Sequence, residues 1–157
     1  MKASQQTMME HSEVKIRLLE TYLKKYLQIL SLSPFTSDIY LYDLFSGEGI
    51  YENGGKGSPI IFLETIKNTY FAHRNKGIGK FNCLFNDFNR NKIEKLTTIV
   101  QEKKLHYSDI GELIYSTEDY NDILKSVVNE VNRFKNEKAF VFIDPYGYKD
   151  IRLKDIS

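Results

Sequence analysis

The hydrophobic residues near the N-terminus recur at helical spacing. From Ser12 to Leu30 apolar side chains return every three or four positions, as on one face of an α-helix. They form two adjacent rows, Val14, Leu18, Tyr22, Tyr26 and Leu30 in one and Leu19, Leu23 and Leu27 in the other. Ser12 can cap this helix, and Pro34 ends the segment. We therefore predict a helix within residues 11–34, preceded by a disordered, polar N-terminus over residues 1–10.

After residue 35 short apolar runs alternate with longer segments of helical spacing. The apolar runs predict four strands, Asp38–Phe45, Phe81–Phe85, Glu112–Ser116 and Ala139–Ile143. The intervening segments predict a helix that Ser58 caps and Pro59 begins, and helices over Asn89–Lys104 and Tyr120–Lys135. This alternation indicates βαβ units and a parallel sheet with both faces covered. The predicted fold class is α/β, with one Rossmann-like domain over residues 35–157.

Four strands are fewer than a doubly wound sheet normally contains. The chain ends at Ser157, shortly after the fourth predicted strand. We therefore expect the N-terminal half to two-thirds of such a fold, with its C-terminal strands missing. In that case the fourth strand has an unprotected edge.

Composition narrows the class of protein only in part. A formal net charge of +1 gives no overall argument for nucleic acid or an anionic membrane as a partner. The apolar runs are too short to span a bilayer, and the polar N-terminus lacks a signal peptide's apolar stretch. The one cysteine, Cys83, lies in an apolar run and predicts a buried thiol in the reducing cytoplasm. The three histidines show no ligand-like spacing, so no metal site is predicted.

The most unusual residues follow the first and fourth predicted strands, which we expect to be neighbours. Open parallel sheets bind ligands outside the carboxyl ends of their strands, where the strand order reverses. The first strand leads into Asp43-Leu-Phe-Ser-Gly-Glu-Gly49. Gly47 and Gly49 allow a tight turn and close approach of a ligand, although a plain turn explains them equally well. Asp43 can bind a cationic amino group or brace the loop.

This loop departs from the dinucleotide-binding fingerprint. Glu52 stands where G-x-G-x-x-G has its third glycine, and the loop continues to Gly57 before the helix begins. Glu48 and Glu52 would repel phosphate groups. The loop therefore favours a cofactor without phosphates, and a nicotinamide-dependent oxidoreductase is the least favoured reading.

Side chains after the second and third strands can complete an adenosine site. Asp87 can accept hydrogen bonds from ribose hydroxyls, or cap the next helix. Phe88 can pack against adenine or in the core, and Asp119 can reach the adenine amino group or serve as an N-cap.

The fourth strand leads into Asp144-Pro145-Tyr146. Pro145 keeps Asp144 extended, so that the carboxylate can accept a hydrogen bond from an amine or hydroxyl awaiting methylation. Tyr146 offers a ring on which a planar substrate can stack. The alternative is a turn with two half-buried tyrosines.

These motifs resemble those of class I S-adenosylmethionine-dependent methyltransferases. Asp43–Gly49 is similar to their first motif, Asn86-Asp87 to their ribose-binding position, and Asp144–Tyr146 to the Asp/Asn-Pro-Pro-aromatic motif of amino-methylating members. Across nearly the whole chain the order of pieces resembles the three-Cys-motif partner protein (TcmP) family. Those pieces are a helix with His11 and Lys15, D-L-F-S-G-E-G, G-S-P at 57–59, N-D at 86–87 and F-I-D-P-Y-G at 142–147.

The resemblance implies a bacterial or phage methyltransferase that uses S-adenosylmethionine and is linked with a partner protein carrying a three-cysteine motif. An amino group of nucleic acid is one candidate acceptor. Tyr146 replaces the second proline of the amino-methylating motif, so an inactive nucleotide-binding or partner-docking module is the alternative. The implied catalytic residues are Asp144, Pro145 and Tyr146, and the implied cofactor-binding residues are Asp43, Phe45, Ser46, Gly47, Gly49, Asp87, Phe88 and Asp119.

Overall fold

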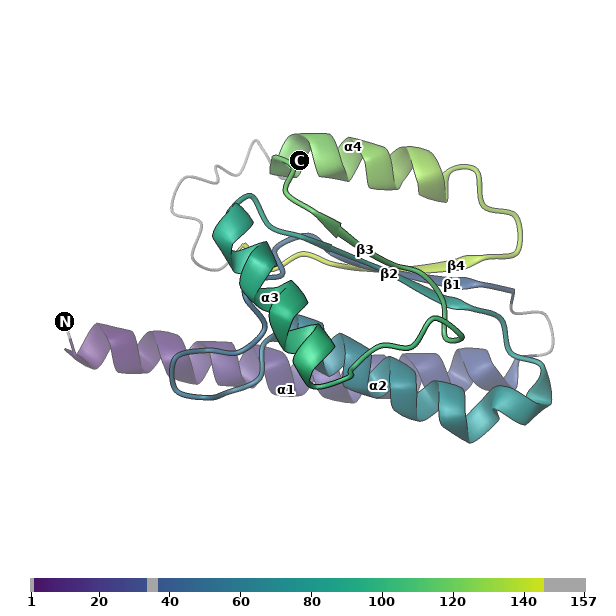
Figure 1. Cartoon of the computed structure of the whole chain (residues 1–157), viewed down its shortest axis with the longest axis horizontal. Helices are drawn as coiled ribbons and strands as arrows, with labels where there is room; N and C mark the ends of the chain where they lie inside the picture. Colours follow the sequence, from purple (N-terminus) through teal and green to yellow (C-terminus); the bar gives the residue numbers. More distant parts are fainter. Residues whose placement is uncertain (1, 34–36, 146–157) are drawn as a thin grey trace.

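The computed structural model describes residues 2–33 and 37–145, and the side chains of residues 2–12 and 75 lie outside that description. In chain order its elements are α1 (Lys2–Leu32), β1 (Ile39–Asp43), α2 (Ser58–His73), the 3-10 helix η1 (Arg74–Lys76), β2 (Phe81–Asn86), α3 (Arg90–Glu102), β3 (Leu113–Ser116), α4 (Tyr120–Val131) and β4 (Lys138–Phe142) (Figure 1). Each predicted strand is present, with ends that differ slightly from the prediction. The alternation of strands and helices is therefore confirmed.

The four strands form one parallel sheet in the order β3-β2-β1-β4. Leu41 at the centre of β1 lies opposite Cys83 of β2 on one side and Phe140 of β4 on the other. The chain runs outward from β1 through β2 to β3 and then returns to the other side of β1. The strand order therefore reverses between β1 and β4, the two strands that we predicted to be neighbours. This arrangement is compatible with a Rossmann-like fold.

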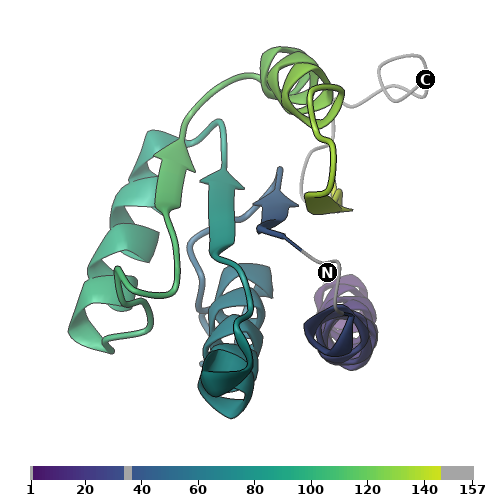
Figure 2. The ribbon, with the colours of Figure 1, turned by 90° about the vertical axis from the view of Figure 1, so that its right-hand side faces the viewer.

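Helices cover both faces of the sheet. Helices α1, α2 and α3 lie on one face and α4 lies on the other (Figure 2). Alternate residues of β1 supply the two cores, since Leu41 packs in the cluster beneath α1 and α2 while Tyr42 packs in the cluster beneath α4. The polar end of Tyr42 donates a hydrogen bond to Glu130 of α4. Both faces of β1 are therefore buried.

Helix α1 is longer than the sequence pattern predicted. It begins at Lys2, so residues 2–10 are helical and the expectation of disorder there is wrong. Residues 2–11 contain neither glycine nor proline and include several strong helix formers, so nothing in this stretch interrupts a helix. Ser12 consequently lies inside the helix and not at its N-terminus, so the predicted cap position is wrong.

Only one of the two predicted apolar rows of α1 is buried. Leu23 and Leu27 are fully enclosed against the core, whereas Leu18 and Tyr22 of the other row are mostly exposed. The ring of Tyr22 lies 5.8 Å from that of Phe140, and Tyr26 donates a hydrogen bond to the Ala139 carbonyl at 3.2 Å. Helix α1 therefore packs beside β4, which is an outer strand of the sheet and has no second neighbouring strand among the described residues.

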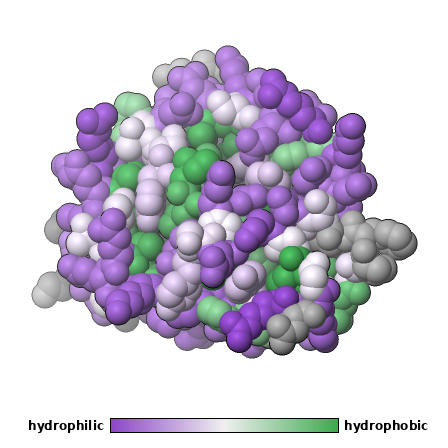
Figure 3. All heavy atoms as spheres, turned by 45° about the vertical axis from the view of Figure 1, so that its right-hand side comes forward, coloured by the Kyte–Doolittle hydropathy of each residue, from purple (hydrophilic) through white to green (hydrophobic). Residues whose placement is uncertain are grey.

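The surface of the domain is mixed in character. The face in Figure 3 is mostly hydrophilic, with smaller hydrophobic patches between the polar side chains. Among residues 2–33 and 37–145, no helix combines the length and the apolar character needed to cross a membrane.

Candidate functional site

Three carboxylates gather where β1, β2 and β4 end. Asp43 is the last residue of β1, Asp87 follows β2, and Asp144 lies two residues beyond β4. All strands are parallel, so their carboxyl ends meet at the same edge of the sheet. The structure therefore brings together acidic residues that are far apart in the sequence, at the point where the strand order reverses.

Asp43 is the most deeply buried of these groups. Its side chain is 0% exposed, and Oδ2 accepts a hydrogen bond of 2.5 Å from the Ser58 hydroxyl. Oδ1 is enclosed without a hydrogen bond of normal geometry from any described residue. Burial raises the pKa of Asp43 to about 7, opposed by the Ser58 hydroxyl and the Phe45 amide and reinforced by the charges of Asp144 and Asp87. A cationic ligand beside Asp43 would relieve this repulsion.

Ser58 has a different role from the predicted one. The N-cap of α2 is Gly57, and Ser58 is the first helical residue, followed by Pro59. The hydroxyl binds the carboxylate of Asp43 instead of a backbone amide of its own helix. The predicted start of the helix is therefore confirmed, but the predicted cap is wrong, because the N-cap position is occupied by Gly57 and Ser58 lies inside the first turn.

The two predicted glycines of the glycine-rich loop have different surroundings. Gly47 has φ +69°, its N–H donates to Asp87 Oδ2 at 3.0 Å, and a Cβ there would meet no atom within 4 Å. Gly49 has φ +94°, but a Cβ there would lie 2.9 Å from Cδ1 of Leu96 and 3.3 Å from Cδ1 of Ile60. Gly47 therefore faces open space that a ligand can occupy. Gly49 packs against the helices behind the loop.

Asp87 braces the loop from the neighbouring strand. It is 2% exposed, and its two oxygens accept hydrogen bonds from the Gly47 amide and, at 2.8 Å, from the Asn89 amide. The N-cap of α3 is Asn89, whose side chain accepts from the Asn91 amide. Asp87 thus joins the β1 loop to the start of α3 and shapes the place where a ribose was predicted.

Asn86 is a site residue whose structural role the sequence analysis missed. Its amide group donates to the carbonyls of Leu44 and Glu118, and its oxygen accepts from the Glu118 amide at 2.9 Å. These bonds join the loops that follow β1 and β3 across the end of β2. A buried asparagine at the end of an apolar strand was the signal for this role, since buried amides are normally fully hydrogen-bonded.

Replacing Asn86 with alanine is expected to lower the free energy of unfolding by about 2 kcal/mol, because three hydrogen bonds are lost and their backbone partners stay partly buried. Urea denaturation of the variant and the wild type measures this change. Replacement of the exposed Asn129 on α4 serves as the control and should change stability by less than about 0.5 kcal/mol. Equal stability of the Asn86 variant and the wild type would contradict the bridging role.

The other predicted cofactor-binding residues divide between core and surface. Phe45 is buried and stacks on Tyr120 with ring centroids 5.0 Å apart, and Ser46 is also buried. Phe88 is 64% exposed, and Asp119 is exposed at the N-cap of α4 without a side-chain capping bond. Phe88 and Asp119 can therefore contact a ligand, whereas Phe45 and Ser46 support the loop from behind.

Asp144 lies at the end of β4 and is linked to α1. Its Oδ1 is 3.0 Å from Nζ of Lys15, and the two side chains are 23% and 45% exposed. Pro145 follows it and is half-buried. Tyr146, the third predicted catalytic residue, lies outside the described residues.

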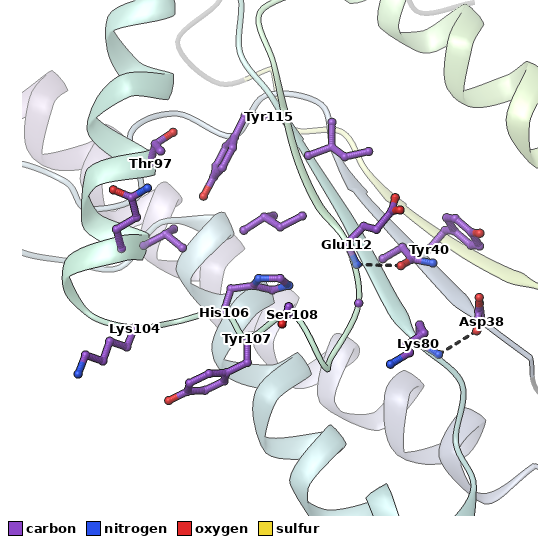
Figure 4. Close-up of a pocket in the computed structure, with 16 residues that line it drawn as sticks. Asp38, Tyr40, Lys80, Thr97, Lys104, His106, Tyr107, Ser108, Glu112 and Tyr115 are labelled. Carbon is purple, nitrogen blue, oxygen red and sulfur yellow. Dashed lines mark hydrogen bonds between the residues drawn. The ribbon is translucent and has the colours of Figure 1, made fainter.

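A hollow occurs elsewhere in the domain, between α3 and β3 (Figure 4). It has a volume of about 1020 Å³, and Tyr40, His106 and Tyr115 are among its lining residues. Burial lowers the pKa of His106, which favours its neutral form. This hollow also reaches Asp38 and Lys80, which precede β1 and β2, so it lies away from the strand ends that carry the acidic cluster. Open parallel sheets bind ligands at their carboxyl edge, so we take the acidic cluster, and not this hollow, as the candidate ligand site.

The part of the chain that the structure describes contains no group of three or more His, Cys, Asp or Glu side chains placed to hold a metal ion. Comparison with protein-family models, curated proteins and solved structures gives no match to this chain. The function must therefore be inferred from the chemistry of the site.

Proposed function

We propose that this chain is the cofactor-binding part of an S-adenosylmethionine-dependent methyltransferase, of the three-Cys-motif partner type that its motifs resemble. The main support is the convergence of Asp43, Asp87 and Asp144 on the carboxyl edge of the sheet, beside the open space in front of Gly47. Open parallel sheets bind their ligands at this place.

The charge of the site suits this cofactor. S-adenosylmethionine carries a sulfonium and an amino group, and both are cationic. Burial raises the pKa of Asp43, and the charges of Asp144 and Asp87 add to that rise, so a cationic ligand would stabilise these carboxylates. The loop also carries Glu48, which pairs with Lys95 at 3.2 Å, and the exposed Glu52. These acidic side chains disfavour a pyrophosphate, so a dinucleotide fits less well.

When bound, S-adenosylmethionine supplies a methyl group that the sulfonium makes electrophilic. The chain's own residues then contribute binding and alignment, which can account for a large part of the acceleration in such a transfer. Gly47 lets the backbone approach the ligand, and Asp87 holds that backbone in place. Asp43, whose carboxyl group is fully enclosed, braces the loop through Ser58 and acts on the cationic amino group through its charge. Asp144 accepts one from the acceptor amine and orients it, and the resemblance suggests a nucleic-acid amino group as that acceptor.

One observation favours a second function, a methyltransferase-like module that docks a partner without turnover. Both oxygens of Asp87 are bonded to backbone amides and the side chain is almost fully buried. If this carboxylate is only a brace, the fold can be stable with no adenosine ligand. Nucleotide binding distinguishes the two functions.

Calorimetric titration with S-adenosylmethionine, S-adenosylhomocysteine and NADH tests the proposed cofactor. We expect micromolar binding of the first two and weaker binding of NADH. Gly47→Ala should weaken the binding of both adenosyl ligands at least about tenfold, because its Cβ would enter space left open by the protein.

Gly54→Ala is the matched control. Gly54 lies in the same loop, has φ +84°, and a Cβ there also meets no atom within 4 Å, so the backbone strain is comparable. Unchanged affinity in this variant attributes the loss in Gly47→Ala to the blocked ligand. Equal losses in both variants, or preferential binding of NADH, would contradict the proposed cofactor site, and no binding at all would favour the docking module.

A further inference from the structure

Lys15 brings a positive charge to the acidic cluster from the far end of the sequence. Its Nζ lies 3.0 Å from Oδ1 of Asp144, although 129 positions separate the two residues. Lys15 belongs to α1 and Asp144 follows β4, so their contact exists only because α1 packs along the outer strand of the sheet.

The position of Lys15 is set by the packing of α1. One turn further along the helix Leu19 is buried in the core, and Leu23 and Leu27 continue the same row. Further on, Tyr26 donates a hydrogen bond to the Ala139 carbonyl of β4 and lies with its ring 5.6 Å from that of Phe140. The ammonium is therefore carried on a helix that is anchored to the same strand that positions Asp144.

The ion pair also changes the net charge around the three carboxylates at the carboxyl edge of the sheet. The charge of Asp144 reaches Asp43, where it adds to the effect of burial on the carboxyl group. A ligand at the carboxyl ends of β1 and β4 would lie within the range of the partly screened charges of both residues. The ammonium of Lys15 offsets one of the negative charges that such a ligand meets.

We propose that Lys15 is a positioning residue that holds Asp144 at the carboxyl edge of the sheet and, through its charge, reduces the preference of the site for cationic S-adenosylmethionine over neutral S-adenosylhomocysteine. This inference rests on the proposed function. The two ligands differ in the charge at sulfur, so the ratio of their affinities reports the electrostatic field there. A lysine that served only to stabilise the fold would change both affinities equally.

The test is calorimetric titration of both ligands into the full chain and into Lys15→Gln, Lys15→Arg and Lys25→Gln. In Lys15→Gln the affinity ratio should shift about threefold to tenfold toward S-adenosylmethionine, because the positive charge of Lys15 is removed from beside Asp144. The shift should shrink at about 0.5 M salt, where the Debye length is only a few ångströms. Lys15→Arg keeps the charge and should retain the wild-type ratio, as should Lys25→Gln, which removes an exposed lysine elsewhere on α1.

The outcomes separate this inference from the function on which it rests. Wild-type binding with an unchanged ratio in Lys15→Gln overturns the role of Lys15 alone. A shift of the same size in Lys25→Gln also overturns it, since the effect would then belong to net charge. Failure of the wild type to bind either ligand overturns the proposed function and this inference with it.

Discussion

Replacing Asp43 with asparagine is expected to remove a pH dependence of stability worth up to about 4 kcal/mol. The carboxyl group is fully buried, and its pKa is raised from 3.8 to about 7. Between these values the folded protein keeps the proton and the unfolded chain loses it. The wild type should therefore lose stability as the pH rises from about 4 to about 7, and show no further change from this group above that range.

The asparagine variant carries no charge at this position and should lack that slope. Its amide has nearly the shape of the protonated carboxyl group, and the Ser58 hydroxyl can hydrogen-bond to either. The stability difference between variant and wild type should therefore shift in favour of the variant with rising pH.

Urea denaturation at closely spaced pH values between about 4 and 8 measures this difference directly. Asp109→Asn is the control, because Asp109 is exposed and its backbone carbonyl, not its carboxylate, accepts the hydrogen bond from Lys80. Parallel stability profiles for Asp43→Asn and the wild type would show that the buried carboxyl group does not hold its proton into the neutral range. Added S-adenosylmethionine should reduce the wild-type slope, if the ligand compensates the charge.

Phe62→Ala is expected to destabilise the domain by about 3–5 kcal/mol, the usual cost of removing a buried aromatic ring. Phe62 on α2 is fully enclosed. Its ring lies 5.9 Å from the rings of both Phe85 on β2 and Phe140 on β4. The cavity would therefore open beneath the centre of the sheet. Neither α1 nor α2 could move to fill it without losing its own contacts with other strands.

Thermal and urea unfolding measure this loss. Phe71→Ala is the matched control on the same helix, because Phe71 is 45% exposed and its removal should cost about 1 kcal/mol or less. A loss of similar size in both variants would contradict the packing described for α2. We expect Phe62→Ala to unfold cooperatively still, with a lower midpoint of thermal and urea unfolding.

The local pattern of the sequence determined the elements and much of their arrangement. Apolar runs such as Phe81–Phe85 predicted strands because residues buried on both faces of a parallel sheet show no polar alternation. The longer segments with helical spacing predicted the helices between them. The βαβ order then implied a parallel sheet, and the position of the acidic residues after the strands implied that they would meet at one edge. These inferences depend on neighbours in the chain, which a sequence displays directly.

Tertiary structure decided which partner each of these residues contacts. The sequence offers two apolar rows on α1, and only packing against α2 and β4 selects the row of Leu23 and Leu27 for burial. The Ser58 hydroxyl donates a hydrogen bond to Asp43 because folding brings the end of β1 beside the start of α2. The pairing of Lys15 with Asp144 requires α1 to lie along β4. Periodicity describes one element at a time, whereas hydrogen bonds and ion pairs depend on distances between elements that only the packed chain defines.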